Sequence, residues 1–475
     1  MFTPRLDLSE TYSSNLALTG GVSRAGWISD VAPAIRIDIN GPRIKGNADY
    51  RRDILRYAGA PALNRNLNTL ASAITVDAVD HWLFVDMSAN VLQRSISSFD
   101  AVATRVGSTP QNQAETTTIT LSPYIKGRVA DIASYLLRVT SIQSHSNQAA
   151  LASTRVDSWS GTLKNASAGA RVGWSLDGSA SHVRNDVIGN RSDSRLRGAL
   201  TVEAISNVHA TLSTGYEDSD YLAGSSRHVA TPGAGLDWTP SPSTHFAAVT
   251  EKRFFGTGHN FLITHRTGLT NWQYTDVRDA TVLPVLLSGA GQGTVAQLLS
   301  DLLAASIPDP AARAEAVRNR LNQDNNALSQ VPADGAQTSR VFIDRLRDAS
   351  VAWIGRRDTT TLHLVRREQE AVGAISGITD SFTLSSKIAE RGVNLSWLHR
   401  LTPTMTLNAT AAWLRRDGSG ASNPASSQKS QTVTLAYRLS PQTIASLSGR
   451  STRFTSTITS SFREDAIVAS LIYRF

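Results

Sequence analysis

The chain has 475 residues, of which 41% are hydrophobic and none is cysteine, and its formal net charge is +8. No window offers the ~18 consecutive apolar residues that a transmembrane helix needs, which excludes a helical membrane protein. The lack of cysteine excludes disulfides and thiolate metal sites, and it fits passage through an oxidising periplasm. The charge is scattered along the sequence without forming a patch, which argues against nucleic-acid binding.

Hydrophobic and polar residues alternate with a period of two almost throughout the chain. In the run 208–217, Val208, Ala210, Leu212, Thr214 and Tyr216 share one face, and mostly polar residues share the other. Such alternation predicts β-strands with one apolar and one polar face. A soluble β-sandwich would also alternate. Three features favour a membrane barrel: strands of about ten residues, connections that alternate between short and long, and aromatic residues at strand ends.

In chain order, the predicted strands lie near residues 4–13, 28–39, 44–56, 68–79, 82–95, 115–128, 132–145, 154–166, 170–183, 194–205, 208–217, 228–239, 244–254, 259–266, 269–277, 346–355, 360–369, 387–400, 404–415, 429–439, 443–454 and 464–475. We therefore predict an all-β fold, a transmembrane antiparallel up-and-down β-barrel of about 22 strands (range 16 to 22). The whole chain, 1–475, forms this single barrel in a Gram-negative outer membrane. The even number places both termini in the periplasm. The sequence begins without a basic and apolar leader, so we expect the numbering to start near the mature protein.

Residues 278–345 interrupt the period of two and are predicted to form a partly helical extracellular insert. One helical stripe consists of Val295, Leu298, Leu299, Leu302 and Leu303. A second helix is expected over 309–323, with Asp309 as its N-cap and Pro310 at its first position. Two roles stay open for the insert: a lid or plug that narrows the mouth, or an ornament packed on the rim.

Aromatic side chains at the predicted strand ends are candidates for the lipid–water interface, where Trp and Tyr prefer to lie. They are Trp82, Trp238, Phe246, Trp397, Trp413, Tyr437, Tyr473 and Phe475. The final strand ends on Phe475 with Tyr473 two residues earlier, which resembles the recognition signal of bacterial outer-membrane barrels. We therefore expect the barrel-assembly machinery, outer-membrane lipid and lipopolysaccharide as partners.

Charged residues on the polar faces are candidates for the lining of the lumen. They are Arg36, Asp38, Lys45, Asp49, Arg51, Asp86, Arg138, Arg171, Asp177, Arg195, Arg197, Glu203, Glu217, Asp237, Arg438 and Arg474. One interpretation is a cross-strand ladder of paired charges that stiffens the wall. The other is a hydrated channel for polar or anionic solute such as a glycan, and both can hold together. The excess of arginine fits GC-rich codon usage, or arginines that meet anionic cargo or lipopolysaccharide phosphates.

Catalytic and metal sites are not expected. Asp80-His81 lies in a short turn assigned to the periplasm, and no carboxylate partner of His259 or His265 is evident from the spacing. No metal-binding spacing is present, no cofactor is expected, and the chain is not predicted to be an enzyme. TonB-dependent transport is not expected either, because strand alternation begins at Arg5 and leaves no room for an N-terminal plug domain.

Several stretches resemble the PEP-CTERM-system-associated outer-membrane barrel family of exopolysaccharide-producing Gram-negative bacteria. They are 6–15 (LDLSETYSSN), 29–35 (SDVAPAI), 83–90 (LFVDMSAN), 93–97 (QRSIS), 340–342 (RVF) and 349–352 (ASVA). The resemblance implies a channel or scaffold for export or surface assembly of polysaccharide, with polysaccharide and export-system proteins as partners. It carries over no functional residue. The alternative function is a general or substrate-selective diffusion porin.

Overall fold

The computed structural model describes residues 1–21, 23–102, 112–147, 153–165, 171–186, 189–222, 227–282, 338, 340–373, 380–420 and 423–475. Its strands are β1 (Phe2–Ser13), β2 (Gly26–Asn40), β3 (Ile44–Tyr57), β4 (Arg65–Val79), β5 (Leu83–Ser95), β6 (Gln113–Val129), β7 (Ala133–Ser146), β8 (Thr154–Asn165), β9 (Val172–Asn185), β10 (Arg191–Ile205), β11 (Val208–Ser219), β12 (Arg227–Ala230), β13 (Gly233–Ser241), β14 (Thr244–Arg253), β15 (Gly256–Arg266), β16 (Thr270–Val282), β17 (Val341–Ile354), β18 (Asp358–Ala371), β19 (Lys387–Arg400), β20 (Met405–Ser419), β21 (Ala425–Arg438), β22 (Thr443–Ser456) and β23 (Phe462–Arg474). Two short helices, η1 (Pro61–Leu63) and α4 (Ser381–Leu384), lie in connections.

The strands form one closed antiparallel barrel of 22 wall strands, which confirms the predicted fold. Each strand pairs with its neighbours in the chain, and β1 also pairs with β23, from Arg5 opposite Arg474 to Ser13 opposite Ala466. The segments β12 and β13 both pair with β11, so together they form a single wall strand. The predicted strand 228–239 is interrupted there because Pro232 has no backbone N–H to donate to the sheet.

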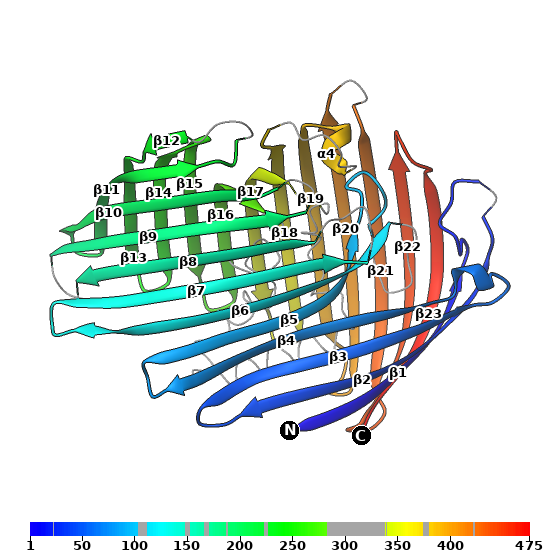
Figure 1. The fold of residues 1–475 in the computed structure, drawn as a ribbon. Helices are drawn as coiled ribbons and strands as arrows, with labels where there is room; N and C mark the ends of the chain where they lie inside the picture. The colour runs from blue at the N-terminus through cyan, green and yellow to red at the C-terminus, as the bar shows by residue number, and fades with distance from the viewer. Residues whose placement is uncertain are drawn as a thin grey trace.

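The two ends of the barrel differ. Both termini and short connections such as 80–82, 130–132 and 206–207 lie at one end, which we call the turn end (Figure 1). Asn207 adopts a φ of 69° in its turn, a conformation that asparagine tolerates better than most residues. The opposite end, called the loop end, holds η1, α4 and the longer connections.

Both edges of the predicted insert belong to the barrel wall. Strand β16 continues to Val282 and β17 begins at Val341, and these two residues pair directly. Residues 278–282 and 341–345 therefore belong to the barrel, because their alternating side chains continue the sheet. The two predicted helices at 294–305 and 309–323 lie outside the described residues. Within the part that the structure does describe, no helix has both the length and the hydrophobicity to cross a bilayer.

The outer face is apolar and rich in tryptophan. Eight of the nine tryptophans are exposed, and the ninth, Trp413, is half-buried. Most of the predicted interface aromatics lie near the turn end, whereas Trp413 lies further toward the loop end. Trp238 stacks on Phe246 with ring centroids 5.1 Å apart. Exposed aromatics and aliphatic residues on one face are what a lipid-facing wall requires.

Candidate functional site

The pairing register places the predicted lumen residues on the inner face and brings several together. Arg36 lies 2.8 Å from Asp38 and 3.7 Å from Asp49, Asp86 lies 2.9 Å from Arg138, and Asp177 lies 3.1 Å from Arg197. Others pair with groups that the sequence analysis did not single out, as Asp237 does with His245 at 2.8 Å. Among the described residues, no ion pair is formed by Lys45, Arg171, Glu203, Arg438 or Arg474.

Arg51 is the centre of a cluster on the inner face of β1–β3. Its guanidinium lies 2.6 Å from Asp7, 2.6 Å from Asp53 and 3.5 Å from Asp30. The side chain of Asp53 is fully buried. One arginine thus links three strands around the seam where the barrel closes, as cross-strand charge pairs can.

A second charged network lies toward the loop end of β10–β16. The fully buried carboxylate of Glu217 accepts from Arg253 Nε at 2.8 Å and from the backbone N–H of Phe254 at 2.9 Å. Arg253 also lies 2.9 Å from Asp279, and Glu251 lies 2.5 Å from Arg195 and 3.5 Å from Arg197. Glu251, Arg253 and Asp279 were missed by the sequence analysis, because only the register shows which charges meet.

Hydroxyl groups form further cross-strand pairs on the inner face. Ser122 bonds to Thr140 at 2.9 Å, Thr201 to Thr211 at 2.8 Å, and Thr434 to Ser448 at 2.9 Å. Ser446 bonds to Ser470 at 2.6 Å. The wall of the lumen is therefore lined by charges and hydroxyls on strands all around the barrel, which suits a polar solute.

An apolar cluster lies on the inner face near the loop end. There Ile142, Val156 and Val183 share one buried cluster with Tyr221, Phe254, Val282, Val341 and Val372. Burial in this cluster raises the pKa of the Tyr221 phenol to about 12, so the phenol stays protonated at neutral pH.

One segment at the loop end links distant parts of the wall across the interior. Residues 96–102, which we call the strap, follow β5, a strand that pairs only with β4 and β6. Besides Asn112 before β6, the residues that they contact include side chains of β17–β23 and of α4, on another part of the barrel. The backbone of Val102 makes two hydrogen bonds to the Gln428 side chain, at 2.9 and 2.8 Å. Figure 1 shows this connection reaching toward the loop ends of β20 and β21.

Buried side chains anchor the strap. Phe99 is completely buried against Phe342, Phe382 and Ile388, and Ala101 packs on Phe454 and Phe462. A Cβ added at Gly418 would lie 2.8 Å from the Phe99 ring, so only glycine leaves room for that ring.

Polar groups hold the strap as well. Arg416, itself paired with Glu390 at 2.7 Å, donates to the Ser98 carbonyl at 3.0 Å. The Ser98 N–H donates to the Ser381 hydroxyl at 2.9 Å. The strap is therefore fixed to the inner side of β17–β23 at the loop end. The sequence feature that could have pointed to the strap is Phe99, an isolated phenylalanine in a mostly polar loop.

Histidines pair with carboxylates at several separate places. His259 Nε2 lies 2.9 Å from Asp276, a carboxylate partner that the spacing along the chain did not indicate. His399 lies 2.7 Å from Asp358, and His363 also pairs with Asp348. The two residues of each pair lie on neighbouring strands, which spacing along the chain does not reveal. Among the described residues, no group of three or more His, Cys, Asp or Glu side chains could hold a metal ion.

No known family model matches the chain, and no curated protein matches its sequence. Among solved structures it is similar to the FrpB iron transporter from Neisseria meningitidis, F3-3 variant, at 10% identity and a TM-score of 0.53, over 100% of this chain and 81% of that one. The apoprotein form of the F5-1 variant from the same organism gives 10% identity and a TM-score of 0.51, again over 100% of this chain and 81% of that one. At this identity the likeness concerns the fold alone. The chain is thus a β-barrel of the outer-membrane type.

Proposed function

We propose that this chain is an outer-membrane conduit for export of polysaccharide, held closed in its resting state by the strap. The turn end faces the periplasm and the loop end faces the cell exterior, in the orientation that single-chain bacterial barrels adopt. The exposed tryptophans and aliphatic residues of the outer face support the membrane location.

The strap is the observation that carries the proposal. Complete burial of Phe99, and hydrogen bonds from Arg416 and Gln428, hold it against the inner wall. A diffusion porin needs a pore that stays open, whereas a conduit for a large polymer must be shut between export events. A short tethered segment that blocks part of the mouth and can detach suits the second need.

The chemistry of the lumen supports a glycan as cargo. Its hydroxyl pairs and charged pairs offer hydrogen-bond donors and acceptors, and the polar lining extends over most of the barrel wall. The resemblance to the exopolysaccharide-associated barrel family favours this cargo over other polar solutes. The similarity to an iron transporter concerns the barrel alone and supports no cargo.

Deletion of the gene in its native host tests the proposal. Surface exopolysaccharide, measured by glycan staining and by sugar analysis of the cell-surface fraction, should be lost and then restored by the intact chain. Purified protein in planar bilayers should show little conductance at rest. Unchanged surface glycan together with a steady large conductance would instead favour the diffusion porin.

A further inference from the structure

The outer face near the loop end carries cations in cross-strand rows. Arg347, Arg366, Arg391 and Arg415 lie directly opposite one another on the successive strands β17, β18, β19 and β20. A second row, which we call the β21–β23 row, consists of Lys429, Arg453 and Arg463. The sequence analysis found no charge patch because these residues are far apart along the chain.

The register shows that both rows face outward. Side chains two residues apart on a strand share a face. Leu364 on the strand of Arg366 is 42% exposed, and Val433 on the strand of Lys429 is 51% exposed, as a lipid-facing position requires. An apolar row adjoins the first cation row on the side of the turn end. It consists of Ala349, Leu364, Val393 and Trp413. The cations therefore lie at the edge of the apolar band.

These rows are incompletely neutralised by the protein. Like charges directly opposite one another destabilise a sheet. Carboxylates relieve part of the repulsion: Glu368 pairs with Arg366 at 2.8 Å, Asp417 with Arg415 at 3.0 Å, and Asp465 with Arg463 at 3.0 Å. Among the described residues, no carboxylate lies within ion-pair distance of Arg391, Lys429 or Arg453. All three are exposed.

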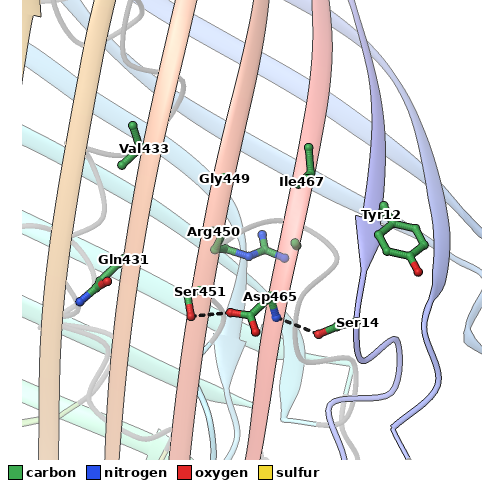
Figure 2. A pocket seen from close by; sticks show the side chains of 10 residues that line it. Tyr12, Ser14, Gln431, Val433, Gly449, Arg450, Ser451, Asp465 and Ile467 are labelled. Carbon is green, nitrogen blue, oxygen red and sulfur yellow. Dashed lines mark hydrogen bonds between the residues drawn. The ribbon is translucent and has the colours of Figure 1, made fainter.

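A hollow of about 490 Å³ adjoins the β21–β23 row on the same outer face. Figure 2 shows Val433, Gly449, Ile467 and Tyr12 on four neighbouring strands around it, with Ser451 and Asp465 joined by a hydrogen bond beside them. A Cβ at Gly449 would meet no atom within 4 Å, so the glycine leaves open space in the lipid-facing wall. Along β22, Arg453, Ser451 and Gly449 follow one another on the outward face.

We propose that the β21–β23 row and this hollow bind lipopolysaccharide, with a lipid A phosphate on Lys429 and Arg453 and an acyl chain over Gly449. Two unpaired cations beside an apolar hollow match a phosphate ester joined to hydrocarbon, and charge-assisted contacts to phosphate are strong. Lipopolysaccharide fits better than phospholipid because the cations lie at the loop end, where single-chain barrels face the outer leaflet. The site lies on the lipid face and is independent of any cargo in the lumen.

Binding of purified rough lipopolysaccharide to the full chain in non-ionic detergent, followed by microscale thermophoresis, tests the site. The double variant Lys429→Gln/Arg453→Gln should bind at least about tenfold more weakly, since it removes both charge-assisted contacts to the phosphate. The matched control Arg52→Gln/Arg56→Gln removes two outward cations at the loop end of β3, outside both rows, and should bind as the parent does.

The hollow is tested separately with Gly449→Leu, which fills it at a strand position that has room for a side chain. Its affinity should also fall about tenfold, while circular dichroism and heat-modifiable mobility show a folded barrel. Dephosphorylated lipid A should bind weakly to the parent chain. Unchanged affinity of the double variant, or equal affinity for phosphatidylglycerol in the same detergent, would overturn the assignment to lipopolysaccharide.

Discussion

Replacing Phe99 by alanine should release the strap and open the barrel. The ring is completely buried among Phe342, Phe382 and Ile388, and truncation of such a side chain costs about 3–5 kcal/mol. The strap keeps its backbone bonds to Gln428, Arg416 and Ser381, so the barrel itself should remain folded. A loss of about 3 kcal/mol shifts the balance between docked and free strap by roughly 100-fold. The fraction of time that the barrel spends open should rise by about that factor.

Single-channel recording in planar bilayers measures this fraction directly. Phe261→Ala is the matched control, because Phe261 is a partly exposed phenylalanine of β15 that does not contact the strap. Since the chain has no cysteine, a single Ser98→Cys reports strap position through maleimide labelling. Ser98 is 2% exposed, so labelling should be slow in the parent and fast in the Phe99→Ala background. Fast labelling without any gain in conductance would refute the idea that the strap closes the lumen.

Three further changes test other parts of the structure. Gly418→Ala should push on the Phe99 ring and raise the open fraction less than Phe99→Ala does, since overpacking costs about 1–3 kcal/mol; an unchanged recording would contradict the tight fit. Glu217→Gln should lower the free energy of unfolding in urea by about 3 kcal/mol, because the buried Arg253 loses one of its carboxylate partners. The control Glu203→Gln should change this free energy little, because Glu203 is an inner-face carboxylate without an ion pair among the described residues. Replacing 283–337 by a short turn should leave a folded and still closed barrel, because Val282 and Val341 pair directly and the strap is held by described residues outside this range; steady opening would give the insert a part in closure.

The barrel wall could be predicted almost completely from the sequence. Alternation has a period of two in a strand, so each residue's face follows from its position, and lipid demands an unbroken apolar stripe. The number of wall strands was predicted on this basis. The break at Pro232 and the extension of β16 and β17 into the predicted insert were not, because pairing with a neighbour decides where a strand stops.

The contacts between strands could not be predicted in the same way. A lumenal arginine such as Arg51 was identifiable as inward-facing, but its partners Asp7, Asp30 and Asp53 follow from the register of three strands. A shift of one register position would separate them. The same holds for His259 and Asp276, whose pairing no local spacing indicates.

What the sequence by itself determined is the closed sheet, its two faces and its lipid-facing aromatics, because these depend only on local periodicity. What only the tertiary structure decided is which distant groups meet. The strap reaches Gln428 across 326 residues of chain, and the rows of outward cations form only when seven strands lie side by side. Periodicity sets the face on which a side chain lies, whereas barrel closure and register set its neighbours.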